Sequence, residues 1–234
     1  MPFPFPRLVT CALLGLLSIG LSTAALPLAP SADPAINEPY QDPDYDRWVE
    51  RFERPGREVY DRRQAILMAV DPQPGMDIAD IGAGTGLFTW LFAESVGPTG
   101  RVFAVDIAEG FVRNIERTAT ERGLANVVGV VNSQVDTGLP PESVDLVFLC
   151  DTYHHFERPA AMLGSIHRAL RPGGRLILVD YERIPGESPA WVMGHVRAGK
   201  EVFAEEIRQA GFVFDGEADL LREHYLLRFH KPAR

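Results

Sequence analysis

The sequence predicts an α/β fold in which helices cover both faces of a parallel sheet. Short apolar segments alternate with segments of helical periodicity, and the connections between them are short. The segment Val144–Cys150 is nearly all apolar, which is typical of a strand that is buried on both faces. A glycine-rich turn at 82–86 joins a predicted strand to a predicted helix. Ligands of such sheets bind at the carboxyl ends of the strands, so we expect functional residues there.

Helices are expected before the sheet and between its strands. Residues 45–70 are predicted to be helical, with an interruption at 55–56, where proline and glycine stand together. In Glu109–Arg122, apolar residues recur at a spacing of four from Phe111 to Ala119, which indicates one buried helix face. The other expected helices are Leu87–Val96, a helix that begins at Pro159 and stops at the turn 171–174, and a helix over about 190–210.

Strands are expected where short apolar runs lie between turn residues. The predicted strands are, in chain order, Asp77–Ile81, Arg101–Asp106, Val127–Val131, Val144–Cys150, 175–181, 213–215 and 225–229. The last two are interpreted as closing strands that follow the final helix.

The first 25 residues are predicted to be a secretory signal peptide. Arg7 is the only charged residue before Asp33, and 8–21 is an uncharged apolar run of 14 residues. Thr23 and Ala25 supply small side chains at the −3 and −1 positions of a cleavage site. The run is shorter than the roughly 20 residues of a spanning helix. We therefore expect export, to the periplasm in a bacterial cell, without stable membrane insertion after cleavage. An uncleaved membrane anchor is the alternative.

Residues 26–44 are predicted to be an acidic, proline-rich linker. Prolines forbid a continuous helix, so an extended tether is expected. The prolines concerned are Pro27, Pro30, Pro34, Pro39 and Pro43. The folded domain is then expected to span 45–234.

Composition excludes several classes of protein. The formal net charge is −9, from 23 basic and 32 acidic residues, so the chain is a poor candidate for binding nucleic acid. The two cysteines are Cys11, inside the apolar run, and Cys150, alone in the body. Two cysteines so placed form neither a disulfide framework nor a zinc site built on several thiolates.

The strongest motif is the stretch ADIGAGTGLFT after the first predicted strand. Gly82, Gly84 and Gly86 allow a tight turn and a close approach to a ligand, and the following helix offers N–H donors. The dinucleotide fingerprint would need its third glycine at Leu87, which disfavours a nicotinamide oxidoreductase. Asp80, two residues before the first glycine, is a poor neighbour for a pyrophosphate and a good one for a cationic ligand.

The second predicted strand ends in Asp106, where a carboxylate can accept hydrogen bonds from ribose hydroxyls. Together with 80–86 and the turn LRPGG at 170–174, this residue resembles the class I S-adenosylmethionine-dependent methyltransferases. The resemblance covers about 45–234 and looks closest to the type 11 branch, with its quinone-biosynthesis and other small-molecule enzymes. It implies a Rossmann-like, seven-stranded, mostly parallel sheet with an antiparallel last strand, and S-adenosylmethionine as cofactor.

The resemblance also implies a set of cofactor-binding residues. These are Asp80, Gly82, Ala83, Gly84, Gly86, Asp106, Ile107, Ser133 and Asp151. Ser133 and Gln134 follow the third strand, where the family contacts the adenine. The family usually has an acidic residue there, and this sequence does not. Asp151 follows the fourth strand, where the family places groups near the methyl donor and the acceptor.

His154 and His155 are the candidate catalytic residues, and such a pair is common after the fourth strand in this branch. One is interpreted as structural and the other as a general base or an orienter of the acceptor, since an imidazole with a pKa near 6.5 suits proton transfer. No metal site is expected, because adjacent side chains diverge and no further ligand is evident from the spacing.

Two other groups are expected near the pocket. Trp48, Phe52 and Tyr60 either cover it or pack on the sheet. His195 and Arg197 follow the fifth strand, and they either bind an anionic substrate group or lie on a solvated helix face.

These features predict an enzyme that moves a methyl group from S-adenosylmethionine to a small organic acceptor. Holding the nucleophile in line with the S–methyl bond can supply roughly 7–11 kcal/mol of the barrier. The alternative is an exported, non-catalytic protein of the same fold that binds S-adenosylmethionine or S-adenosylhomocysteine, since the donor is made in the cytoplasm. Methylation of nucleic-acid amines is disfavoured, because 151–154 reads DTYH and lacks the Asn/Asp-Pro-Pro-aromatic motif.

Overall fold

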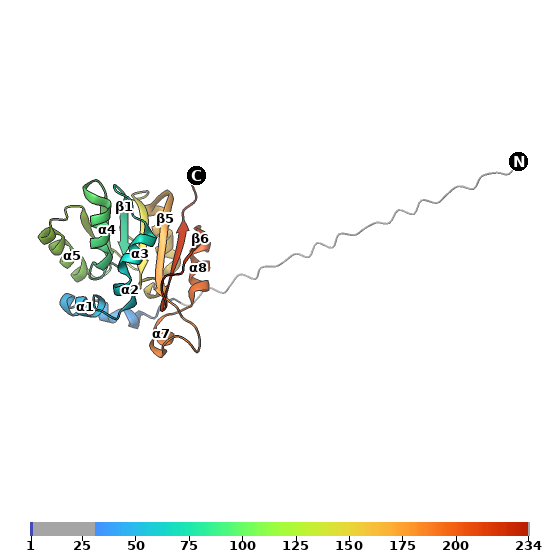
Figure 1. The fold of residues 1–234 in the computed structure, drawn as a ribbon, viewed down its shortest axis with the longest axis horizontal. Coiled ribbons are helices and arrows are strands. Elements are labelled where there is room, and N and C mark those ends of the chain that lie inside the picture. The colour runs from blue at the N-terminus through green and yellow to red at the C-terminus, as the bar shows by residue number, and fades with distance from the viewer. Residues whose placement is uncertain (2–30, 234) are drawn as a thin grey trace.

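The computed structural model describes Met1 and residues 31–233. Its centre is a seven-stranded sheet in the order β3-β2-β1-β4-β5-β7-β6 (Figure 1). The strands are β1 (Asp77–Ile81), β2 (Arg101–Asp106), β3 (Val127–Val131), β4 (Val144–Cys150), β5 (Leu170–Tyr181), β6 (Val213–Ala218) and β7 (His224–His230). Strands β1 to β5 pair in parallel, and β7 is antiparallel to both of its neighbours. The predicted fold class and its antiparallel last strand are confirmed.

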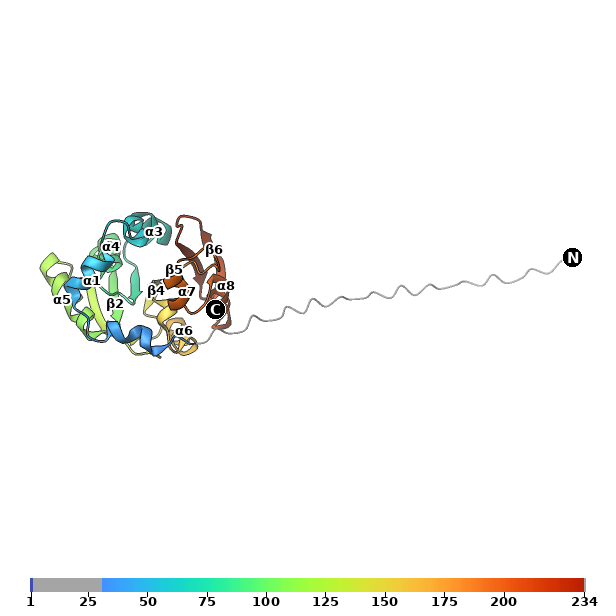
Figure 2. The same cartoon turned by 90° about the horizontal axis from the view of Figure 1, so that it is seen from below.

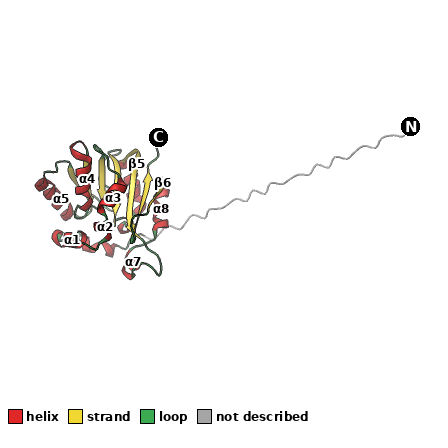
Figure 3. Ribbon diagram, in the orientation of Figure 1, coloured by secondary structure: helices red, strands yellow, loops and turns green. Residues whose placement is uncertain are grey.

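Helices and short 3-10 turns surround this sheet (Figure 3). The α-helices are α1 (Tyr45–Phe52), α2 (Glu58–Asp61), α3 (Arg63–Val70), α4 (Leu87–Val96), α5 (Glu109–Arg122), α6 (Pro159–Ala169), α7 (Ala190–His195) and α8 (Lys200–Gln209). The 3-10 segments are η1 (Pro34–Tyr40), η2 (Gly97–Thr99) and η3 (Tyr153–His155). None of the helices within 31–233 is long and apolar enough to cross a membrane. The predicted signal peptide lies almost wholly outside the described residues.

The sheet separates two apolar cores. Seen from below, α3 and α4 lie on one side of the strands and α6 on the other (Figure 2). On the first side, Phe92 and Ile66 pack on alternate strand residues such as Ile78. On the second side, Leu163 and Phe203 pack on the residues that point the other way. This alternation, with both faces covered, explains why the strands read as nearly continuous apolar runs.

Several elements differ from the expected ones; β6, for example, extends to Ala218, and α2 and α3 are separate helices. The helix expected over 190–210 is two helices, because the backbone is extended at Val196 and Gly199 and Arg197 between them turns inward to an ion pair with Glu206. Strand β5 begins at Leu170, since that residue already pairs with Val144 before a bulge. Residues 34–40 of the expected linker form a 3-10 helix, with Asp33 accepting a hydrogen bond from the backbone at its start.

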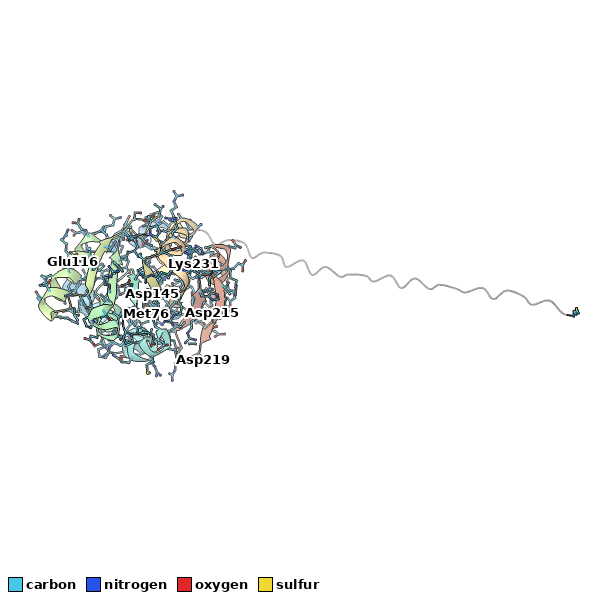
Figure 4. The ribbon with its side chains drawn as sticks, turned by 90° about the horizontal axis from the view of Figure 1, so that it is seen from above. Met76, Glu116, Asp145, Asp215, Asp219 and Lys231 are labelled. Atoms are coloured by element: carbon cyan, nitrogen blue, oxygen red, sulfur yellow. The ribbon has the colours of Figure 1, made fainter. Side chains whose placement is uncertain are left out.

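The end of the sheet where β1 and β4 begin is held by charges. The backbone N–H of Asp77 donates to the Asp145 carboxylate at 2.8 Å, and Arg171 contacts both carboxylates at 2.9 and 2.7 Å. Figure 4, viewed from above, shows Met76 and Asp145 close together at this end. The covering helices α1 and α7 lie at the opposite end of the strands (Figure 1). One end of the sheet is therefore held by hydrogen bonds and ion pairs, and the other end is covered by helices.

Candidate functional site

The turn between β1 and α4 needs glycine for two reasons. Gly82, Gly84 and Gly86 all have φ between 55° and 88°, the left-handed region. A Cβ on Gly82 would collide with the Thr152 side chain, and one on Gly86 would lie 2.6 Å from the Trp90 ring. The turn therefore packs against neighbouring segments at distances that other residues do not allow.

Two buried carboxylates flank this turn. Asp106 accepts hydrogen bonds from the backbone N–H groups of Gly84 and Ala108, both at 2.9 Å, and its burial raises its pKa. Asp80 accepts a hydrogen bond from the Thr89 hydroxyl at 2.6 Å. Burial, with a smaller contribution from the Asp106 charge, raises the pKa of Asp80 to about 7. An ionised carboxylate has about four lone-pair sites, so both side chains keep acceptor capacity for a ligand.

A cavity of about 880 Å³ opens beside these carboxylates, at the carboxyl ends of the strands. Its wall contains most of the predicted site residues: Asp80, Gly82, Ala83, Gly84, Asp106, Ile107, Ser133, Asp151, His154 and His155. Gly86 is not among the wall residues; it stands in the left-handed conformation at the start of α4. The structure thus brings together groups that lie as far as 75 residues apart in the sequence, from Asp80 to His155.

An N-terminal segment covers the cavity. The Tyr40 ring stacks on the Trp48 ring at a centroid distance of 4.7 Å, and the Phe52 ring lies tilted against Trp48 at 4.8 Å. Phe52 lies over the glycine turn, and the Tyr45 hydroxyl donates to the carbonyl of Thr85 at 2.9 Å. Of the aromatic residues expected near the pocket, Phe52 is in the wall, whereas Trp48 packs on α5 and Tyr60 stacks with Arg63. Phe52 therefore fits the interpretation of a cover, whereas the contacts of Trp48 and Tyr60 are with helical residues and not with the sheet that the alternative named.

A charged network anchors the cover at the end of β4. Arg57 donates to Asp151 at 2.6 Å, and the His224 imidazole bridges Glu58, at 2.9 Å, to Asp151, at 3.2 Å. Burial opposes ionisation of Asp151, but His224 and Arg57 outweigh it and hold the pKa of this carboxyl well below its usual range. Asp151 is therefore an anion already engaged by two protein cations, in the wall of the cavity.

The two predicted catalytic histidines have different partners. His154 is buried, and its Nδ1 lies 2.7 Å from the Asp180 carboxylate, which is also buried. His155 places its Nδ1 2.8 Å from the Asn37 amide oxygen. The expectation that adjacent side chains diverge is wrong here, because the 3-10 turn η3 keeps the two ring centroids 4.3 Å apart. The His195 ring joins them, with its centroid 5.1 Å from each.

The remaining predicted residues divide between the cavity and the core. His195 lines the cavity, but Arg197 pairs with Glu206 at 2.6 Å in the interior, where it meets neither a substrate nor solvent. The Ser133 hydroxyl accepts hydrogen bonds from the backbone of 135 and 136, so it shapes its own turn. Gln134 donates to Glu157, another wall residue.

Sequence reasoning missed several wall residues: Asn37, Tyr40, Arg57, Thr152, Tyr181 and Trp191. Asp180, which holds His154 from behind the wall, was missed as well. The one local indication is that Asp180 is a charged residue next to the end of an apolar strand, much as Asp106 ends β2.

Comparison with known proteins adds sequence relatives to this geometry. Residues 79–178 match the Methyltransf_11 family, described as a methyltransferase domain. Nocamycin O-methyltransferase from Saccharothrix syringae is 37% identical over 142 residues, which cover 59% of this chain and 49% of that protein. A ubiquinone/menaquinone biosynthesis C-methyltransferase from Hydrogenovibrio crunogenus is 32% identical over 124 residues, 53% of this chain and 48% of that protein. The chain spans about half the length of these curated relatives.

Solved structures share the architecture at low sequence identity. A SAM dependent methyltransferase from Aquifex aeolicus matches with a TM-score of 0.70 and 21% identity, covering 81% of this chain and 99% of that chain. The cyclase SpnF matches with a TM-score of 0.72 and 16% identity, covering 90% and 100%. Such similarity shows the fold and does not by itself name a reaction. With the family match over the glycine turn and both flanking carboxylates, residues 79–178 of this chain are identified as a class I S-adenosylmethionine-dependent methyltransferase domain.

Proposed function

We propose that the protein transfers a methyl group from S-adenosylmethionine to a small organic acceptor. The observation that carries this proposal is that the wall of a single cavity contains Asp80 and Asp106, beside the glycine turn, together with His154 and His155, which follow β4. One side has the groups to hold a donor, and the other has groups that can orient an acceptor and take up a proton.

The residues of the donor side fit S-adenosylmethionine. The glycine turn leaves backbone where side chains would otherwise fill the space, and Asp106 has acceptor capacity for ribose hydroxyls. Asp80 offers a buried negative charge to a cationic ligand, and the cavity volume suits a ligand of this size. When bound, the cofactor supplies an activated methyl group on a sulfonium cation.

The protein's own contribution is orientation, exclusion of water and proton uptake. Phe52 and Tyr40, which belong to the N-terminal segment, form part of the cavity wall and limit the access of water. His154, with Nδ1 hydrogen-bonded to the Asp180 carboxylate, has Nε2 as its proton-accepting atom. An acceptor hydroxyl beside that atom could lose its proton as it becomes a nucleophile.

The acceptor side has aromatic walls. Tyr181 and Trp191 meet edge to face at 4.9 Å, and Phe156 lies in the same cavity. We infer an acceptor with a flat or largely apolar body and one ionisable group. This inference is compatible with the names of two relatives, an O-methyltransferase and a C-methyltransferase. Those names describe the relatives and do not identify the acceptor of this chain.

Calorimetry followed by a turnover assay tests the proposal. Titration with S-adenosylmethionine and S-adenosylhomocysteine should show one saturable site, and titration with NAD should show none. Release of S-adenosylhomocysteine should then be measured over a panel of phenols, carboxylic acids and amines. Cofactor binding without turnover on any acceptor would favour the non-catalytic alternative, and NAD binding would overturn the assignment of the donor side.

We also propose that the protein is exported through an N-terminal signal peptide. The support is the sequence pattern alone: Arg7, the apolar run 8–21, and small residues at Thr23 and Ala25. Cleavage would leave a chain that begins at Leu26 and retains every described element.

A further inference from the structure

Three histidines from two separate segments converge on one point of the cavity. His154 and His155 come from η3, and His195 is the last residue of α7. One ring nitrogen of each lies within 4.8 Å of the corresponding nitrogens of the other two. All three residues line the same cavity, so their meeting point is open to a ligand.

Hydrogen bonds fix which nitrogen of the first two rings carries a lone pair. His154 Nδ1 faces the Asp180 carboxylate, which only accepts when ionised, so this nitrogen is the N–H donor. The Asn37 amide nitrogen donates to the His155 carbonyl and to Glu157, so its oxygen must be the atom that faces His155 Nδ1. In the neutral form of both rings, the lone pair is therefore on Nε2.

This arrangement is the one that metal-binding histidines have in proteins. Such residues donate their other ring N–H to a carboxylate or carbonyl, which fixes the tautomer and raises the basicity of the ligand atom. Here the Asp180 carboxylate accepts the hydrogen bond from His154, and the Asn37 amide oxygen accepts the one from His155. Within the described residues, nothing forms a hydrogen bond with the His195 ring, so the third imidazole is available to a ligand.

The surroundings suit a bound cation. The Asp180 carboxylate is buried directly behind His154, close to the place that an incoming cation would take. His154 is buried, whereas His155 and His195 are partly exposed in the cavity wall.

We propose that His154, His155 and His195 form a binding site for one divalent transition-metal ion, with an open coordination position toward the cavity. Three imidazoles suit Zn²⁺ and its first-row neighbours, whereas Mg²⁺ prefers oxygen ligands. Metal–nitrogen bonds of about 2.1 Å in tetrahedral geometry place the nitrogens about 3.4 Å apart, so the widest pair closes by at most about 1.4 Å. His195 is at the end of a six-residue helix, where its side chain can make this movement.

The site goes beyond methyl transfer and does not depend on it, because metal binding needs neither donor nor acceptor. If both proposals hold, an acceptor hydroxyl that takes the open position has its pKa lowered by the metal charge. The three histidines would then act together as ligands, and the proton of that hydroxyl would pass to water in the cavity rather than to His154.

Zinc titration of the tag-free, full-length protein tests the proposal. After treatment with a chelator and dialysis, calorimetry with ZnCl₂ should show one saturable site, and MgCl₂ should show none. His195→Ala should lose binding, and Asp180→Asn should weaken it about 10–100-fold. His230→Ala is the matched control, because His230 lies on β7 in a pair with Asp215, and it should bind zinc as the unmodified protein does.

Two results would overturn the site: no saturable zinc binding by the unmodified protein, or equal affinity in His195→Ala and His230→Ala. Binding of S-adenosylhomocysteine by each variant, in the absence of metal, shows whether the cavity is intact. Cobalt titration of the unmodified protein needs no variant: a spectrum of imidazole-ligated, four-coordinate cobalt supports the site, and that of the hydrated ion contradicts it. Cofactor binding is measured separately, so failure of either proposal is recognisable by itself.

Discussion

The guanidinium of Arg57 and the carboxylate of Asp151 form a largely buried ion pair, with Nη2 2.6 Å from Oδ2. The pair joins the segment between α1 and α2 to the residue that follows β4. Asp151 has φ of 51°, a conformation that non-glycine residues adopt rarely. Its carboxylate thereby reaches both Arg57 and His224, and the cover of the cavity is fixed to the edge of the sheet at this point.

Arg57→Met should destabilise the protein by about 3–5 kcal/mol, because removing one partner leaves a buried charge without its ion pair. Urea unfolding followed by circular dichroism measures this difference. Arg208→Met is the matched control, since Arg208 forms a half-exposed pair with Glu205, and its effect should stay within about 0.5 kcal/mol. Equal effects of the two substitutions would show that the pair with Asp151 does not hold the cover.

Asp106→Ala should lower the affinity for S-adenosylhomocysteine by roughly 10–150-fold, because it removes a charged acceptor worth about 1.5–3 kcal/mol. Asp106→Asn keeps one acceptor oxygen for the backbone and should lose less. Calorimetry measures both, with the exposed Asp219→Asn as a control on overall charge. A dissociation constant that is unchanged in Asp106→Ala would exclude the ribose contact.

His154→Ala should lower kcat by about 10²-fold or more and leave the affinity for S-adenosylhomocysteine nearly unchanged. Asp180→Asn should change kcat in the same direction, because Asp180 fixes the His154 tautomer. His167→Ala, outside the cavity on α6, is the control. The idea fails if both His154→Ala and Asp180→Asn keep the kcat of the unmodified protein from pH 5 to 8, on an acceptor that turns over.

Stability should fall as pH rises from about 7 to 9 because of His224. Burial alone would lower the pKa of His224, but Asp151 and Glu58 outweigh it and raise the pKa to about 9. Because the pKa of His224 is higher in the folded than in the unfolded state, protonation of His224 stabilises the fold. This contribution is complete below the unfolded-state pKa near 6.5 and is lost as the pH rises past about 9. The raised pKa of Asp80, about 7, changes the stability mainly below pH 7, outside the range of this measurement. Urea unfolding at pH 7 and 9 should show the decrease, and His224→Gln should flatten it; a parallel decrease in that variant would refute the assignment.

Export should be visible in a bacterial host that expresses the full sequence. The protein should be recovered outside the cytoplasm with Leu26 at its N-terminus. Leu16→Arg places a charge in the apolar run and should retain the protein in the cell. Finding Met1 on soluble cytoplasmic protein would contradict the signal peptide, and recovery only in membranes, uncut, would favour an anchor.

The sequence predicts the sheet well because each strand and helix is specified by its own local pattern. Asp77–Ile81 through Val144–Cys150 begin and end where they were expected. The break after His195 was not predicted, because it depends on a tertiary ion pair between Arg197 and Glu206. Local periodicity carries no information about such a partner.

The residues of the candidate site also fall into two groups: those that a local motif predicts and those that depend on tertiary contacts. Asp80 and the glycine turn belong to one continuous motif, and Asp106 ends the next strand, so their grouping follows from strand order alone. Asn37 contacts His155 across 118 residues, and Arg57 contacts Asp151 across 94. The position of His195 beside the His154-His155 turn depends equally on how the chain after β5 returns over the cavity.

The segment that covers the cavity is synthesised before the sheet and meets some of its partners late. Glu58 contacts His224 across 166 residues, so its position is settled only when the last strand has been synthesised. Trp48 and Phe52 pack on Phe111 and beside the glycine turn, which are synthesised earlier, so the contact with His224 is the part of the cover that must wait for β7. Contacts of such long sequence separation form slowly, and domains larger than about 100–150 residues often pass through partly folded states. Enclosure of the cavity should therefore be a late event in folding, and binding of its ligand would report that the whole chain has reached its native state.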